Sequence, residues 1–176
     1  MKKHFLIIIL IITIPIVLVL FYLKLSFKTP YKINMQNFLQ IKMGMSYDEV
    51  KAILGEGKID SSVTNSRLNT NLYSWKNNLG GAISITLQGD KVTNKAETKL
   101  SKQNSKVNLK DFNTITVGMT YSKIKALFGQ GQLICESQYI ANDKCDEYSW
   151  INSNESFMTI VFIDNKVVHK SETNLN

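Results

Sequence analysis

The chain contains one sequence pattern twice, and this repeat constrains its fold more than any other feature. Residues 38–57 read FLQIKMGMSYDEVKAILGEG, and residues 112–131 read FNTITVGMTYSKIKALFGQG. Phe, Ile, Gly, Met, Tyr, Lys-Ala and two further Gly residues recur at a constant offset of 74. Downstream, the Tyr-Ser-Trp of residues 73–75 recurs at 148–150. Each copy therefore encodes one supersecondary unit, and the fold has to accommodate two of them.

Each unit is expected to begin with helical turns. Glu49 follows Ser46 by three positions, which is the pattern of a capping box at the start of a helix. Apolar residues then recur with the i, i+3, i+4 spacing of an amphipathic helix until Gly55, where we expect the helix to end. The second unit has Thr120 and Gly129 in the corresponding places. The repeated segment therefore predicts the same short helix in both units, with a helical turn or two before it.

After the helices, the hydrophobic period changes from 3.6 to 2, which indicates strands. Segments rich in Gly, Asn and Asp separate the alternating runs, as expected of tight turns between antiparallel strands. The expected strands are 58–63, 72–76, 82–88 and 91–99 in the first unit, and 132–139, 147–151, 157–163 and 166–173 in the second.

The alternation also predicts which face of each sheet is buried. One face carries Ile83, Ile85 and Leu87, matched by Met158, Ile160 and Phe162, and the helices can cover it. The opposite face is polar in the first unit and unusually apolar in the second. This open face either binds a partner or packs on another part of the chain. The binding residues that it predicts are Phe157, Thr159, Val161, Ile163, Ser84, Thr86 and Gln88.

The last strand of each unit carries Lys and Glu two residues apart. These residues are Lys95 and Glu97 in the first unit and Lys170 and Glu172 in the second. We expect them on a solvated strand edge, where charge protects against aggregation. A ligand contact shared by both units is the alternative.

The N-terminus has the composition of a membrane anchor. Residues 5–23 are uncharged and mostly aliphatic, and nineteen helical residues span about 28 Å, close to one hydrocarbon core. We expect an uncleaved signal anchor rather than a cleaved signal peptide, because the run is longer than the usual apolar region of a signal peptide. Lysines flank both ends, so the positive-inside rule is nearly tied. The short N-terminal tail favours N-in, with the C-terminal domain outside the cytoplasm at the cell membrane.

The net charge of +7 belongs mainly to this N-terminal region. Five of the 21 Lys and Arg residues flank the apolar run, and all 14 acidic residues follow position 47. The rest of the chain is then close to +2, which gives no support to nucleic-acid binding. The flanking lysines are better suited to anionic lipid headgroups.

Two cysteines, Cys135 and Cys145, occur in the second unit alone. We expect a disulfide between neighbouring strands outside the cytoplasm, and a pair of free buried thiols is the alternative. Neither the cysteine spacing nor the two histidines, His4 and His169, fits a metal site, so no metal or cofactor is expected. The sequence contains no recognisable catalytic motif either, and we therefore expect the protein not to be an enzyme.

The pattern F-x-x-I-x-x-G-M-[ST]-Y-x-x-[VI]-K-A-x-x-G, followed by a Tyr-x-Trp strand and a hairpin, resembles the tandem-repeat family related to the β-lactamase inhibitor protein. Small lipoproteins of outer-membrane β-barrel assembly have a related single unit. The resemblance covers residues 34–176. It implies a helix pair on an antiparallel sheet, twice, with the free sheet faces forming a concave surface for a protein partner. It does not imply β-lactamase inhibition here, because the turn at 77–81 has no carboxylate to insert into such an enzyme.

The predicted fold class is α+β: an N-terminal transmembrane helix and two tandem repeats, each a helix pair packed on one face of a sheet of about four strands. The predicted divisions are an anchor at 1–25, a tether at 26–33, and repeats at 34–104 and 105–176. The predicted function is a membrane-anchored module that binds an envelope or extracellular protein through the concave sheet face. A self-associating structural or stress-related envelope protein, and hence a homo-oligomer, is the alternative.

Overall fold

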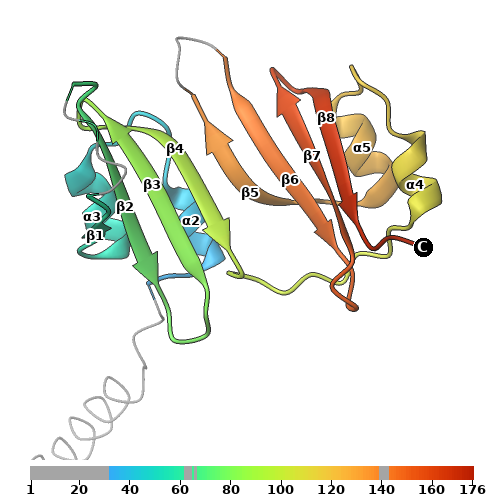
Figure 1. Ribbon diagram of the computed structural model, residues 1–176, viewed down its shortest axis with the longest axis horizontal. Helices are drawn as coiled ribbons and strands as arrows, with labels where there is room; N and C mark the ends of the chain where they lie inside the picture. The colour runs from blue at the N-terminus through green and yellow to red at the C-terminus, as the bar shows by residue number, and fades with distance from the viewer. Residues whose placement is uncertain (1–31, 62–64, 66, 139–142) are drawn as a thin grey trace, which may run out of the picture. The chain divides into compact units, whose positions relative to one another are not determined.

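The strands of both repeats belong to one antiparallel sheet. The computed structural model describes residues 32–61, 65, 67–138 and 143–176. The described residues form eight strands, which lie side by side in the order in which they follow along the chain (Figure 1). Their bounds are β1 Lys58–Ile59, β2 Thr70–Lys76, β3 Ala82–Gln88, β4 Lys91–Thr98, β5 Gln132–Ser137, β6 Cys145–Ile151, β7 Phe157–Ile163 and β8 Lys166–Thr173.

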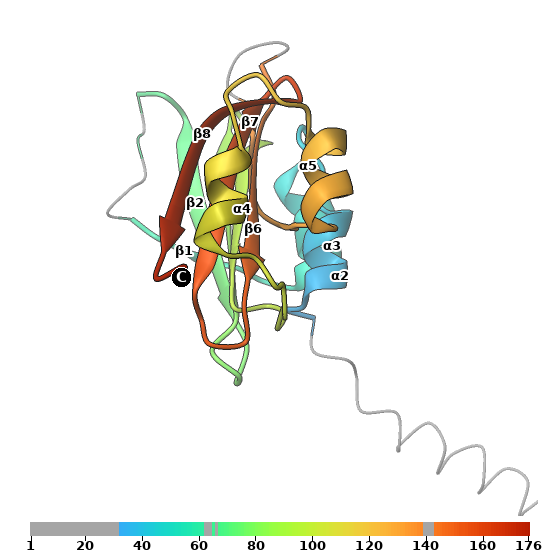
Figure 2. The ribbon, with the colours of Figure 1, turned by 90° about the vertical axis from the view of Figure 1, so that its right-hand side faces the viewer.

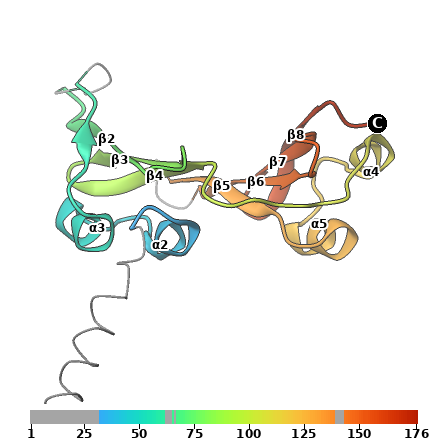
Figure 3. The same ribbon diagram turned by 90° about the horizontal axis from the view of Figure 1, so that it is seen from below.

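Four short helices accompany the strands in the described part of the chain. They are α2 Met35–Gln40, α3 Tyr47–Leu54, α4 Leu109–Thr114 and α5 Tyr121–Phe128. Figures 2 and 3 show α2, α3 and α5 on the same side of the sheet. The sheet therefore has one helix-covered face and one open face.

The helix starts and ends follow the local sequence. The Ser46 side chain accepts a hydrogen bond from the Glu49 backbone N–H, and the Ser46 N–H donates to the Glu49 carboxylate over 2.8 Å, so the predicted capping box is confirmed. Thr120 caps α5 by accepting from the backbone N–H of Lys123. Gly55 and Gly129 end α3 and α5 at φ values of +84° and +77°, which glycine adopts without steric cost.

Two apolar clusters fill the space between the helices and the sheet. In the first, Phe38 and Val50 pack among residues that include Ile85, and all three are fully buried. In the second, Ile124 and Ile160 are equally buried. Each such side chain contributes roughly 1.5–3 kcal/mol by leaving water, so these clusters hold the helices on the sheet.

Two tryptophans anchor the ends of α3 and α5. The Trp75 indole N–H donates to the Gly55 carbonyl over 3.0 Å, and that of Trp150 donates to the Gly129 carbonyl over 3.1 Å. Each hydrogen bond satisfies a carbonyl that the helix end leaves free. Both indole rings are buried, with Trp75 5% and Trp150 0% exposed, so each tryptophan also belongs to the core of its repeat.

The predicted fold class is wrong. It placed two separate sheets of about four strands, each under its own helix pair, behind a transmembrane helix, whereas one continuous sheet carries all eight described strands and the helices are short. The sheets merge because β4 pairs with β5 over three positions, which joins the repeats through backbone hydrogen bonds. In two separate sheets, the outer edges of β4 and β5 would each have unpaired backbone N–H and C=O groups, and their pairing satisfies these groups. Repeated side-chain patterns do not encode this pairing.

Within the described residues, no helix has both the length and the apolar composition needed to cross a membrane. The anchor predicted at 5–23 lies outside those residues.

The expectation of a solvated edge at Lys95 and Glu97 is also wrong. Lys95 is 1% exposed and Glu97 is 8% exposed, and both lie on the helix-covered face. The reason is a register shift in the β3–β4 pair at Thr86 and Leu87. It changes the alternation along β4, so Val92 and Lys95 point to the same face although they are three residues apart.

Candidate functional site

The open face of the sheet is the candidate functional site. Residues paired directly across neighbouring strands point to the same face, and the register therefore defines rows that cross the sheet. One row contains a residue from each of the eight strands: Lys58, Ser74, Ser84, Ala96, Cys135, Glu147, Val161 and His169. Both repeats contribute four residues to it, so the two halves present one continuous surface.

A second row runs parallel to the first on the same face. Its members are Leu72, Thr86, Asn94, Ser137, Cys145, Ile163 and Lys166. Together the two rows bring Ser84 and Thr86 of the first repeat onto the same face as Val161 and Ile163 of the second. Gln88, at the end of β3, is exposed.

The apolar part of this face belongs to β7. Phe157 and Val161 are half-buried, and Ile163 is 41% exposed. Thr159 is only 6% exposed, so it supplies little surface to a partner. The accessible apolar contacts of this strand therefore come from Phe157, Val161 and Ile163.

The centre of the open face holds the two cysteines as free thiols. Cys135 lies across from Glu147 and Cys145 lies across from Ser137, so the thiols are offset by two positions in the register. The Asn94 side-chain amide donates to the Cys135 sulfur over 3.4 Å. Burial raises the pKa of both thiols, which keeps them protonated at neutral pH. The disulfide predicted from the sequence stays a prediction.

A charged cluster lies directly behind these cysteines, on the helix-covered face. Lys95 Nζ is 3.0 Å from Glu136 Oε2, and Lys144 Nζ is 3.3 Å from Glu136 Oε1 and 3.2 Å from Asp146 Oδ2. Lys95 also donates to the carbonyls of Phe38 and Ile41, which end α2, over 3.3 and 2.6 Å. The cluster thus connects a helix of the first repeat to β5 and β6 of the second.

Burial and ion pairing act against each other in this cluster. Burial lowers the pKa of Lys95, and the Glu136 carboxylate opposes that effect. Burial alone would raise the pKa of Glu136, but Lys95 and Lys144 outweigh it and hold that pKa below its usual value. Burial raises the pKa of Asp146, whose Oδ1 atom has no hydrogen-bond partner among the described residues.

Sequence reasoning did not identify this charged cluster. The one relevant signal in the sequence was the Lys-x-Glu pattern, which recurs as Lys95 and Glu97 in the first repeat and as Lys170 and Glu172 in the second. Lys170 donates to the Phe112 carbonyl over 2.8 Å, as Lys95 does to Phe38, and Glu172 accepts from the Leu175 N–H as Glu97 does from that of Leu100. The repeated pair is therefore structural in both copies: the lysine caps the first helix of each unit, and the glutamate holds the turn after its last strand.

The turn between β2 and β3 projects an apolar side chain. Leu79 is 82% exposed, and the Asn77 side chain holds the turn by accepting from the N–H groups of Leu79 and Gly81 over 2.9 and 2.8 Å. A rigid turn of this kind can extend a binding surface. In the described ranges, no group of three or more His, Cys, Asp or Glu side chains lies close enough together to hold a metal ion.

Comparison with known proteins identifies relatives of this architecture. A family model described as Beta-lactamase inhibitor (BLIP) matches residues 34–150. A crystal structure of a proposed beta-lactamase inhibitor protein from Streptococcus mutans superposes with a TM-score of 0.61 at 16% sequence identity, covering 80% of this chain and 95% of that chain. At this level of identity the similarity concerns the fold alone. None of the curated proteins compared with the chain matches it.

Proposed function

This chain belongs to the beta-lactamase inhibitor (BLIP) family, and from that premise we propose that it binds an envelope or extracellular protein through the open face of its sheet. The observation that carries the proposal is the register, which aligns residues of all eight strands into one surface on the face that the helices leave free. The role proposed is recognition rather than catalysis.

On the open face, β7 offers apolar side chains and β3 offers polar ones, so the two strands suit different kinds of contact with a partner. Phe157, Val161 and Ile163 offer apolar area, which supplies most of the free energy of association. Ser84 and Thr86 offer hydroxyl groups that donate and accept hydrogen bonds. A partner that meets both halves would therefore place an apolar patch over β7 and a polar patch over β3.

The rigidity of the sheet supports this role. Strand pairing and the buried ion pair of Lys95 and Glu136 fix the two repeats relative to each other at the β4–β5 junction. A surface that is ordered before binding loses less conformational entropy when a partner arrives. The continuous sheet should thus act as a preformed platform.

Inhibition of a β-lactamase is not part of this proposal. The β2–β3 turn presents the apolar Leu79 at its tip, with no carboxylate at 77–81. We expect the purified protein to leave the hydrolysis of a chromogenic cephalosporin by a β-lactamase unchanged.

We also propose that the protein is located at the cell membrane, with its N-terminus in the cytoplasm and its binding face outside the cytoplasm. It rests on the apolar run at 5–23 and the short basic segment before it. Protease added to intact cells should remove the C-terminal domain, and full protection in cells that remain intact would contradict this location.

The direct test of binding is a cross-linking pull-down with the full-length protein from envelope extract. The variant carrying Phe157→Asp and Val161→Asp places two charges on the apolar strand, and we expect it to lose a specific partner that the wild type retains. The control is Leu127→Asp on α5, where the side chain is 53% exposed on the other side of the sheet. Equal capture by all three proteins would contradict the proposal. Wild-type dimers that the double variant abolishes would instead favour the self-associating envelope protein.

A further inference from the structure

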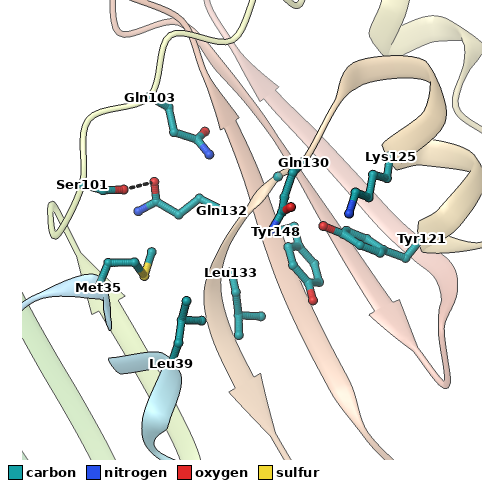
Figure 4. Close-up of a pocket in the computed structure, with 11 residues that line it drawn as sticks. Met35, Leu39, Ser101, Gln103, Tyr121, Lys125, Gln130, Gln132, Leu133 and Tyr148 are labelled. Atoms are coloured by element: carbon teal, nitrogen blue, oxygen red, sulfur yellow. Dashed lines mark hydrogen bonds between the residues drawn. The ribbon is translucent and has the colours of Figure 1, made fainter. Parts of the chain in front are cut away.

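A groove on the helix-covered side of the sheet has no role in the function proposed above. It has a volume of about 370 Å³ and lies where α2 of the first repeat approaches β5 and α5 of the second (Figure 4). Met35, Leu39 and Leu133 gather at one end, and the side chains of Tyr121 and Lys125 lie together at the other. Among the described residues that line the groove, Lys125 alone carries a charge.

The repeat provides an internal comparison for this lysine. In the first repeat, Lys51 forms an ion pair with Glu56, and the same carboxylate accepts from the Tyr47 hydroxyl over 2.7 Å. In the second repeat, Lys125 and Tyr121 occupy the corresponding positions, but Gln130 stands where Glu56 does. Lys125 accordingly has no ionic partner among the described residues.

Lys125 and Gln103 provide free hydrogen-bond donors in the groove. Lys125 has three ammonium donors, and Gln103 keeps its amide N–H donors because its oxygen already accepts from the Ile151 N–H over 3.0 Å. Gln132, by contrast, is engaged with Ser101 and Glu97. A ligand that suits these donors carries an acceptor group with negative charge.

We propose that this groove binds a peptide segment that carries a carboxylate beside an apolar side chain. The carboxylate contacts Lys125, in the place that Glu56 fills in the first repeat. The apolar side chain contacts Met35, Leu39 and Leu133, of which Leu39 is 44% exposed without a ligand. The amides of Gln103 and Gln130 suit the backbone of a peptide, whereas a fatty acid would leave them unpaired. The site faces away from the open sheet surface, so it does not depend on the function proposed above.

The test uses the full-length protein with 13C-labelled methionine methyl groups. Met35 reports on the groove, and Met119 and Met158, which belong to the second apolar cluster, report on the fold. The probes are N-acetyl-Leu-Glu-amide and its neutral match N-acetyl-Leu-Gln-amide. We expect a saturable shift of the Met35 signal with the Glu probe and binding about tenfold weaker with the Gln probe, because a hydrogen bond to a charged group contributes about 1.5 kcal/mol.

The deciding variant is Gln130→Glu, which restores the carboxylate of the first repeat beside Lys125. We expect this variant to bind the Glu probe about tenfold more weakly, with the Met119 and Met158 signals unchanged. The matched control Glu56→Gln alters the first repeat and should leave the affinity of the groove unchanged. Equal affinity for both probes, or unchanged binding by Gln130→Glu, would overturn the proposal. A Met35 shift with octanoate but with neither peptide would overturn it too, because the ligand would then be a simple amphiphile.

Discussion

Lys95 of the first repeat and Glu136 of the second form a buried ion pair, with Nζ 3.0 Å from Oε2. They are directly paired residues of β4 and β5, where the two repeats become one sheet. Lys95 also caps α2 through two carbonyls. One side chain thus links a helix end, a strand and the neighbouring repeat, and the continuity of the open face across the two repeats depends on this junction.

Removing the carboxylate of this pair should destabilise the fold strongly. Glu136→Gln leaves the Lys95 ammonium buried without its counter-charge, and such a loss costs about 3 kcal/mol or more. Urea unfolding followed by circular dichroism measures the change. The control Lys91→Met removes an exposed lysine at the start of β4 and should change the free energy of unfolding by less than about 0.5 kcal/mol. Similar values for both variants would show that the pair contributes nothing.

The same carboxylate should control part of the acid sensitivity. The folded-state pKa of Glu136 is lowered, because Lys95 and Lys144 outweigh the effect of burial. Its contribution to stability is therefore present above the ordinary pKa of 4.5 and is lost as the pH falls through the folded-state pKa. The raised pKa values of Glu97 and Asp146 act in the opposite direction.

The difference in unfolding free energy between wild type and Glu136→Gln isolates the Glu136 contribution. We expect this difference to be constant from pH 7 to about pH 5 and to shrink steadily below pH 4.5. A difference that stays constant down to pH 2 would contradict the assigned direction of the pKa shift.

Gly131 should be intolerant of any side chain. A Cβ atom there would lie 2.7 Å from the nearest ring atom of Trp150, which is fully buried and cannot move aside. Overpacking of this kind costs about 1–3 kcal/mol, so Gly131→Ala should lower the free energy of unfolding by that amount. The contacting atoms belong to the six-membered part of the indole ring. Adding Trp150→Phe should therefore recover part of the loss, and strict additivity in the double-mutant cycle would argue against the clash.

The two thiols should alkylate slowly in the folded protein. Burial raises the pKa of Cys135 and Cys145, which lowers the thiolate fraction at pH 8. We expect iodoacetamide to react at least about tenfold more slowly in buffer than in urea, where the pKa returns to about 8.5. Mass spectrometry of the intact protein after purification in air provides the second readout. A mass lower by two hydrogens would mean that the predicted disulfide has formed, which requires the offset thiols to move together.

The sequence predicts the local elements well because their signals are local. The cap at Ser46, the helix end at Gly55 and the bounds of β3, β7 and β8 all match the predicted positions. Caps, turn residues and apolar alternation act over a few residues, so they can be identified without knowledge of the partners of a segment.

What the sequence did not predict depends on partners that are distant along the chain. The pairing of Ala96 with Cys135 uses backbone groups, which every residue has. The burial of Lys95 depends on the register shift in β4 and on an acceptor from the other repeat. For the candidate site, alternation placed Ser84 and Val161 on open faces, but only the register shows that these faces are one.

Site-specific photocrosslinking of the full-length protein shows directly which face of the sheet contacts a partner. A benzophenone amino acid replaces Val161 or Ser84 on the open face, or Leu127 on α5 as the control. We expect the two open-face positions to give the same partner adduct in envelope extract and position 127 to give none. Adducts from position 127 alone, or no adduct from position 161 and position 84, would contradict the assignment of the open face as the binding surface.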